Sequence, residues 1–148
     1  MKTNFREATI DDLAILEELE QACFPDPWSS AMILSEILMP DSFYRLLSVD
    51  DKVVGYCCYS HVLDELHIMN IAVHPDHRGN GFGNLLVEKI ISDGKDLGVS
   101  AITLEARESN APARRLYEKY RFILAGIRPR YYMDGENAVI YWLYLEDM

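Results

Sequence analysis

The sequence lacks the features of a membrane, secreted or metal-binding protein. No apolar run approaches the roughly 20 residues of a transmembrane helix, and the first seven residues lack the apolar core of a signal peptide. The three cysteines have no metal-ligand spacing, and the four histidines form no recognisable zinc pattern. We therefore expect a cytoplasmic protein with no membrane contact, no metal site and reduced structural thiols.

Basic residues are also scarce. The 148 residues include 14 Lys and Arg against 24 Asp and Glu, a net charge of −10 at pH 7, which disfavours a nucleic-acid backbone as a direct partner. Residues 1–105 hold 7 basic and 18 acidic residues, whereas residues 106–148 hold 7 and 6. An anionic ligand near the later segment and a cationic substrate near the acidic part fit this pattern, as does a solvated surface with accidental asymmetry.

The chain shows no repeat, low-complexity stretch or linker, so we expect a single domain over residues 1–148. Apolar residues make up 49% of it, which is enough for a core. Their periodicity predicts the order β-α-α-β-β-β-α-β-α-β-β, a mixed α/β layer structure. The expected strands are 5–8, 42–49, 52–63, 64–74, 100–106, 122–130 and 138–146, and helices are expected after Thr9, after Ser29, at 81–97 and at 111–120.

The most informative motif is Arg78-Gly79-Asn80-Gly81-Phe82-Gly83, which follows an apolar strand and opens a helix. Its glycines let the backbone approach a ligand without an intervening Cβ. The free N–H groups and positive dipole end of a new helix favour a phosphate. The spacing is neither the G-x-G-x-x-G of dinucleotide folds nor that of a P-loop. Taken alone, the motif is equally explained by an ordinary glycine-rich turn.

This Arg-x-x-Gly-x-Gly turn resembles that of the GNAT superfamily of acyl-CoA-dependent N-acetyltransferases. Residues 104–110 and 115–122 are similar to motifs of N-terminal protein acetyltransferases. Residues 24–29 resemble a loop of bacterial ribosomal-protein alanine N-acetyltransferases (the RimI type), and residues 130–138 resemble a hairpin shared with archaeal and eukaryotic N-terminal acetyltransferases. The resemblance covers essentially the whole chain. It implies a GNAT fold, a single mixed sheet of about seven strands with about four helices.

The resemblance implies acetyl-CoA as co-substrate and a set of residues that bind it. The glycine turn is expected to hold the pyrophosphate. Backbone groups of the preceding strand are expected to pair with the pantetheine arm and to polarise the thioester carbonyl. Asn110 is expected to contact the pantetheine arm, to cap the next helix, or both. The implied cofactor-binding residues are Ile71, Ala72, Val73, Arg78, Gly79, Asn80, Gly81, Phe82, Gly83, Asn84 and Asn110.

The resemblance also implies that Glu105 is the general base and Tyr117 the general acid. An amine must be neutral to attack a thioester, and an α-amine, with a pKa near 8, loses its proton more easily than lysine by roughly 2.5 pKa units, or ~3.4 kcal/mol. A carboxylate can accept that proton directly or through water, and a phenol can protonate the leaving thiolate. A surface ion pair for Glu105 and plain core packing for Tyr117 are the alternative roles.

Three aromatic residues, Trp28, Tyr131 and Tyr132, are candidates for contact with a peptide substrate. Aromatic rings with polar tips suit a wet, selective pocket, although ordinary packing explains each of them too. The resemblance thus implies acetylation of a protein N-terminus, with a ribosomal protein as the leading substrate, by direct attack in a ternary complex. The alternatives are a GNAT enzyme for a lysine side chain or small amine, which the hairpin tyrosines disfavour, and a CoA-binding module without turnover.

The chain departs from the family pattern at one position. GNAT enzymes commonly have Leu-Gly-Phe where this chain has Tyr120-Arg121-Phe122. A residue other than glycine must then end the helix, and we expect a left-handed backbone conformation there.

Overall fold

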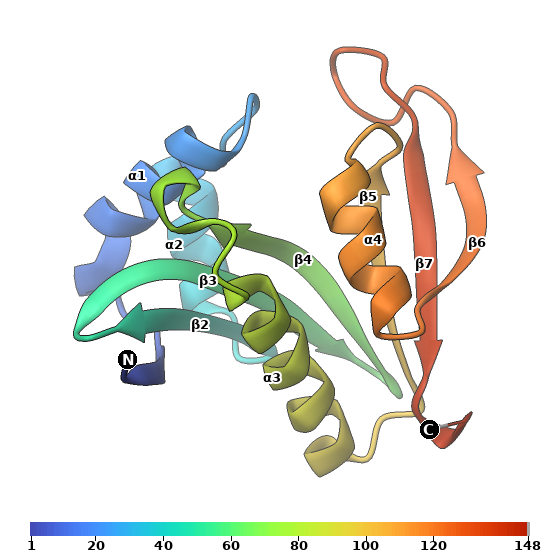
Figure 1. Cartoon of the computed structure of the whole chain (residues 1–148), viewed down its shortest axis with the longest axis horizontal. Coiled ribbons are helices and arrows are strands. Elements are labelled where there is room, and N and C mark those ends of the chain that lie inside the picture. Colours follow the sequence, from blue (N-terminus) through green and yellow to red (C-terminus); the bar gives the residue numbers. More distant parts are fainter. Residues whose placement is uncertain (148) are drawn as a thin grey trace. The chain divides into compact units, whose positions relative to one another are not determined.

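The computed structural model describes residues 1–147, which form seven strands and four α-helices in the predicted order (Figure 1). The strands are β1 (Thr3–Glu7), β2 (Ser42–Val49), β3 (Lys52–Val62), β4 (Glu65–Val73), β5 (Ala101–Arg107), β6 (Ile123–Arg128) and β7 (Ala138–Tyr144). The helices are α1 (Leu13–Cys23), α2 (Ser30–Leu38), α3 (Phe82–Leu97) and α4 (Ala111–Lys119). Within this described part, no helix has the length and apolar character needed to span a bilayer.

The seven strands form one mixed sheet in the order β1-β2-β3-β4-β5-β7-β6. Strands β4 and β5 pair in parallel over residues 65–68 of β4, and α3 forms the crossover connection that a parallel pair requires. The pairs β1–β2, β2–β3, β5–β7 and β6–β7 are antiparallel. The chain divides into two compact units, the first comprising Met1–Ser60 and Asn70–Leu86 and the second His61–Met69 and Val87–Met148.

Local sequence signals set the element boundaries of the first unit. Thr9 and Asp12 form a capping box before α1, in which the Asp12 carboxylate accepts the Thr9 N–H at 2.8 Å. The Ser29 hydroxyl accepts a backbone N–H in the first turn of α2 at 3.2 Å. Asp50 and Asp51 both have positive φ, as a tight turn between two antiparallel strands requires. The predicted strand over residues 42–49 is confirmed as β2.

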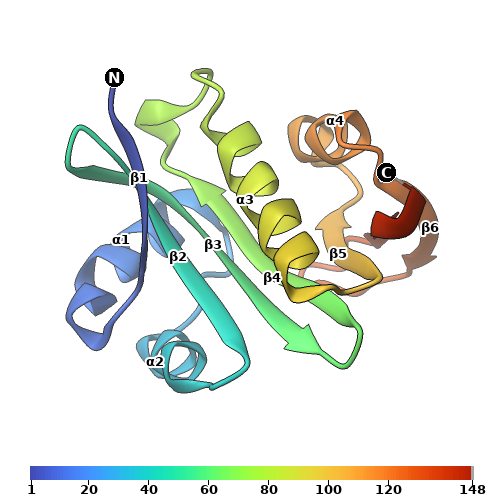
Figure 2. The same ribbon diagram turned by 90° about the horizontal axis from the view of Figure 1, so that it is seen from below.

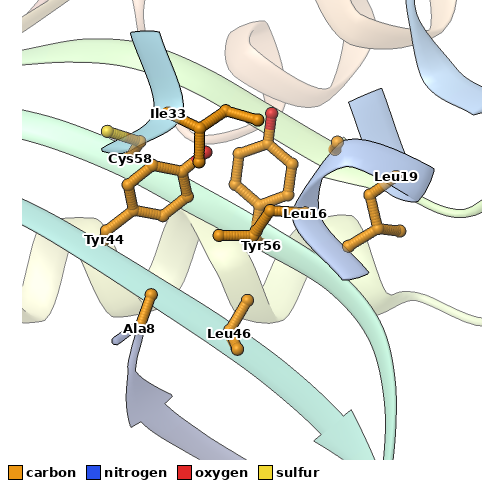
Figure 3. Packing of buried hydrophobic residues seen from close by; sticks show 9 residues of the cluster. Ala8, Leu16, Leu19, Ile33, Tyr44, Leu46, Tyr56 and Cys58 are labelled. Atoms are coloured by element: carbon orange, nitrogen blue, oxygen red, sulfur yellow. The ribbon is translucent and has the colours of Figure 1, made fainter. Parts of the chain in front are cut away.

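The core of the first unit lies where α1 and α2, which are neighbours, cover β2 and β3 (Figures 1 and 2). Figure 3 shows Leu16 of α1 and Ile33 of α2 close to the rings of Tyr44 and Tyr56. Removing each such aliphatic side chain from water stabilises the fold by about 1.5–3 kcal/mol. The buried members of this cluster are Ala8, Leu16, Leu19, Ile33, Tyr44, Leu46, Tyr56, Cys58 and Ala72.

In the second unit, α4 packs along β5 and β7 (Figure 1). The helix begins at Asn110, whose side chain accepts the Ala113 N–H at 3.3 Å, so the predicted capping role of Asn110 is confirmed. Its other end confirms the expectation from the missing glycine, because Arg121 has a φ of 71°. Phe122 then returns to the core beside Tyr117, with ring centroids 5.8 Å apart.

Candidate active site

The turn between β4 and α3 in the first unit is exposed to solvent over residues 78–81. Gly79 and Gly81 both have a φ of 81°, a region that L side chains adopt only at a cost. A Cβ on Gly79 would meet nothing within 4 Å, so conformation rather than crowding requires glycine there. Since α3 begins at Phe82, its first N–H groups have no intrahelical partner. An exposed glycine turn that leads into the N-terminus of a helix fits a diphosphate.

Side chains of the turn hold it to its surroundings. The Asn80 amide donates to the His77 carbonyl at 3.0 Å, and Arg78 Nε donates to the Val73 carbonyl at 3.0 Å. The Cys23 thiol also donates to the Val73 carbonyl, at 3.5 Å. Burial raises the pKa of this thiol, so it stays protonated and serves as a donor. Arg78 and Asn80 therefore shape the turn.

The end of β4 has one backbone edge that does not face β3. The His74 N–H donates to the Val54 carbonyl at 2.8 Å, so the alternation of backbone groups directs those of Ile71 and Val73 to the opposite edge. The register with β5 ends at Ile68 of β4 and does not include residues 71–73. The Val73 carbonyl is already taken by Arg78 and Cys23, so the Ile71 backbone groups and the Val73 N–H are those suited to pairing with an extended amide-containing ligand.

Trp28 and Ala72 take part in the core of the first unit. Ala72 is buried in the cluster described above, and the half-buried Trp28 packs against that cluster. The backbone N–H of Trp28 donates to Glu20 Oε2 at 3.0 Å. Packing therefore accounts for part of the Trp28 side chain, and contact with a peptide stays a prediction.

In the second unit, Glu105 projects from β5 with one oxygen engaged and the other without a partner. Glu105 Oε1 forms an ion pair with Arg128 Nε of β6 at 3.1 Å. Oε2 is buried and accepts no hydrogen bond from any of residues 1–147. A buried acceptor left unpaired costs roughly 1–3 kcal/mol, which favours a role in function. The ion pair considered from the sequence is thus present, and it leaves one oxygen unused.

Tyr117 of α4 is only 8% exposed. Its ring lies 6.1 Å from that of Tyr141 in addition to its contact with Phe122. Burial raises the pKa of the Tyr117 phenol above its usual range, and the neighbouring Tyr132 phenol adds to the rise. Tyr117 is therefore a core residue whose hydroxyl stays protonated at neutral pH, as a proton donor must.

The hairpin after β6 holds two tyrosines edge to face, with the ring centroids of Tyr131 and Tyr132 5.2 Å apart and an interplanar angle of 87°. The Arg107 guanidinium lies 4.1 Å from the Tyr132 ring centroid. It also bonds to Asp134 at 2.8 Å and Glu136 at 3.0 Å. The sequence analysis did not predict this role of Arg107. A basic residue at the end of a strand, together with two acidic residues in the hairpin, could have indicated it.

Comparison with known proteins identifies the family. The model of the acetyltransferase (GNAT) family matches residues 13–122. The chain belongs to the GNAT acetyltransferase family. Its mixed sheet of seven strands and its helices are those of the GNAT fold, and GNAT acetyltransferases use acetyl-CoA. Among residues 1–147, no three His, Cys, Asp or Glu side chains are grouped to hold a metal ion.

This GNAT chain is similar to named relatives over most of its length. The ribosomal protein bS18-alanine N-acetyltransferase of Haemophilus influenzae is 37% identical over 139 residues, which cover 90% of this chain and 93% of the relative. The crystal structure of the ribosomal-protein-S18-alanine N-acetyltransferase from Escherichia coli matches with a TM-score of 0.91 and 33% identity, over 97% of this chain and 94% of that one. The structure of Ard1 from Thermoplasma volcanium matches with a TM-score of 0.90 and 27% identity, over 97% of this chain and 98% of that one.

The GNAT site residues expected from the sequence fall into two sets. The first unit contains the glycine turn, residues 71–73 and Trp28, which offer backbone donors and an aromatic side chain. The second unit contains Glu105 and Tyr117 with Asn110 and the two hairpin tyrosines. The first set can bind anionic and amide groups, and the second can accept and donate protons.

Proposed function

We propose that this GNAT enzyme transfers the acetyl group of acetyl-CoA to the α-amino group of a protein N-terminus, and that the substrate is a ribosomal protein. The relatives named for that reaction support the substrate class. The observation that carries the chemistry is the free Oε2 of Glu105, an acceptor ready for a proton. We also propose that residues 1–148 act as one catalytic domain in the cytoplasm, where ribosomal proteins are made.

Glu105 acts as the general base in this proposal. It takes one proton from the substrate ammonium group, directly or through a water molecule, and the neutral nitrogen then forms a bond to the thioester carbonyl carbon. Arg128 holds Glu105 Oε1 and so fixes the direction in which Oε2 points. The ion pair with Arg128 engages Oε1 alone and leaves Oε2 available as an acceptor.

Tyr117 acts as the general acid. The carbon–sulfur bond breaks as the carbon–nitrogen bond forms, and the Tyr117 hydroxyl donates its proton to the departing thiolate. Burial keeps the phenol protonated, which preserves the donor but makes its ionisation costly. The attacking nitrogen still carries one proton more than the amide product, and this proton returns to Tyr117 in the same turnover; otherwise Tyr117 only orients the thioester sulfur, and that proton passes to the departing thiolate.

The remaining predicted residues bind the two substrates. The residues that would hold acetyl-CoA are the turn from Arg78 to Asn84 for the pyrophosphate, the backbone of residues 71–73 for the pantetheine amides, and Asn110. When bound, acetyl-CoA supplies an activated acetyl thioester. Trp28, Tyr131 and Tyr132 would contact the first residues of the substrate peptide.

The test is acetylation of short peptides that differ only at their first two residues, each paired with an α-blocked peptide that contains lysine. Mass analysis locates the acetyl group. Acetyl on the free α-amine and none on the blocked peptides is the expected result. Acetyl on lysine would move the enzyme to side-chain substrates, and tight acetyl-CoA binding without transfer would favour a non-catalytic module.

The same assay tests the role of Glu105. Glu105→Gln removes the proton acceptor without changing the shape of the side chain, so kcat should fall at least about 100-fold, the usual lower range for a general base. Glu108→Gln is the control, because the exposed Glu108 side chain makes one long hydrogen bond, to the Asn137 amide at 3.3 Å. Equal rates for the two variants would remove Glu105 from the mechanism.

A further inference from the structure

The first unit buries a carboxylate that the proposed mechanism does not use. Glu20 of α1 is 1% exposed, and its hydrogen-bond donors are all uncharged. Tyr56 Oη and Asn70 Nδ2 donate to Oε1, the latter at 2.9 Å. The backbone N–H of Trp28 donates to Oε2 at 3.0 Å. Both oxygens of Glu20 are therefore engaged by neutral donors.

Packing alone does not call for a carboxylate at this position. Burial raises the pKa of Glu20, and the hydrogen bonds from Tyr56, Trp28 and Asn70 oppose that rise. A buried charge without a cation is costly, whereas an apolar side chain fills such a space without that cost. The neighbouring core positions are apolar, as Leu16 and Leu19 show in Figure 3. What only a carboxylate offers is two oxygens that both accept.

The donors to Glu20 come from three separate segments of the first unit. Trp28 lies in the loop between α1 and α2, Tyr56 in β3, and Asn70 in β4 directly before residues 71–73. The Asn70 amide also donates to Tyr56 Oη at 3.0 Å, so the two strand donors support each other without Glu20. The Trp28 N–H forms the bond that joins this part of the loop to the Glu20 carboxylate, and the flanking Pro25 and Pro27 have no N–H to donate to it.

We infer that Glu20 is a positioning residue that fixes the loop carrying Trp28 to the acetyl-CoA strand and thereby sets the affinity for the peptide substrate. The inference rests on the proposed function, in which Trp28 contacts the peptide and β4 contacts the pantetheine arm. Glu20 itself touches neither substrate. Its loss should free the loop while β4 stays paired with β3 through the backbone bond from His74 to Val54.

The first experiment uses the unchanged protein. Amide hydrogen exchange is measured over residues 24–29, where only four backbone amides contribute because Pro25 and Pro27 have no N–H. The measurement does not depend on enzymatic activity. The Trp28 amide should exchange at least about 100-fold more slowly than an unprotected amide. Fast exchange at Trp28 would overturn the inference, whatever the enzyme acetylates.

The second experiment compares variants in the peptide assay. Glu20→Met keeps the size of the side chain but removes both acceptors, and it should raise the KM for peptide about tenfold and abolish Trp28 protection. The kcat and the KM for acetyl-CoA should stay within about twofold. Glu20→Gln keeps one oxygen for the Trp28 N–H, so it should recover most of the affinity. Glu18→Met makes the same substitution on the exposed face of α1. It controls for the exchange of a glutamate for a methionine as such and should change none of these values.

A purely structural role would give a different pattern. Tyr56→Phe removes a donor from Glu20 but leaves the Trp28 bond, so it should lower the melting temperature without raising the KM for peptide. Equal effects of Glu20→Met and Tyr56→Phe on that KM would overturn the inference. If the parent acetylated only lysine, the proposed function would fail, while Trp28 exchange would still report on the loop.

Discussion

Replacing Gly55 with alanine tests how closely β3 must approach the acetyl-CoA strand. A Cβ on Gly55 would lie 2.4 Å from the Ala72 carbonyl oxygen and 3.3 Å from Val73 Cα. Both atoms belong to the β4 backbone, so neither can rotate away as a side chain would. Closely packed interiors transmit such strain, and β4 must shift. We expect Gly55→Ala to lower the free energy of unfolding by about 1–3 kcal/mol, the range of an overpacked core, which a fold of typical stability survives.

Urea unfolding and the KM for acetyl-CoA, measured on the same preparation, give the two readouts. The KM should rise, because the displaced residues 71–73 are those proposed to pair with the pantetheine arm. Gly126→Ala in β6 is the matched control, since its Cβ would lie an ordinary 3.7 Å from Ile140 Cδ1. That variant should stay within about 1 kcal/mol of the parent. If Gly55→Ala were as stable as Gly126→Ala and bound acetyl-CoA equally well, close strand approach would not be what requires glycine at position 55.

Two further predictions concern the phosphate turn and the start of α1. Gly81→Ala forces a side chain into a φ of 81°, so it should cost about 1–2 kcal/mol and weaken acetyl-CoA binding in a calorimetric titration; unchanged affinity would contradict a role of this turn in binding. Asp12 accepts hydrogen bonds from Arg6 at 2.7 and 2.8 Å, and these lower the pKa of its carboxyl from 3.8. The stabilisation from its ionised form is therefore complete above about pH 4 and is lost as the pH falls through the lowered pKa. The stability difference between the parent and Asp12→Asn should shrink toward pH 2 in urea unfolding, and a pH-independent difference would contradict this reasoning.

Local signals made much of the fold predictable from the sequence. Helices were expected after Thr9 and Ser29, and capping was one of the roles considered for Asn110. Ser29 and Asn110 cap α2 and α4, and Thr9 caps the short 3-10 turn that leads into α1. A capping residue acts on backbone groups two or three positions away, so the neighbouring sequence contains the whole interaction. The left-handed Arg121 was predictable for the same reason, because a helix that ends without glycine leaves few other backbone conformations.

Contacts between distant residues were not predictable in this way. The Arg107 side chain meets Asp134 and Glu136 almost thirty positions later, and the Asn70 amide meets Glu20 fifty positions earlier. Each contact depends on strand register and helix placement together, which periodicity alone does not determine. The resemblance to GNAT enzymes indicated Glu105 as a candidate base, but nothing in the sequence indicated that Arg128 would occupy only one of its oxygens.

Glu20 and Glu105 illustrate how the surroundings give one residue type two roles. Three donors occupy three of the about four lone-pair positions of Glu20 and engage both of its oxygens, so this carboxylate is used to hold the structure. Glu105 interacts with Arg128 and with the Tyr131 phenol, while its buried Oε2 has no hydrogen-bond partner among residues 1–147, so it can accept a proton while its ion pair persists. Pairs of carboxylates in different environments commonly divide structural and chemical work in this manner. The count of donors at each oxygen, rather than the position of either glutamate in the sequence, is therefore the strongest structural argument for Glu105 as the base.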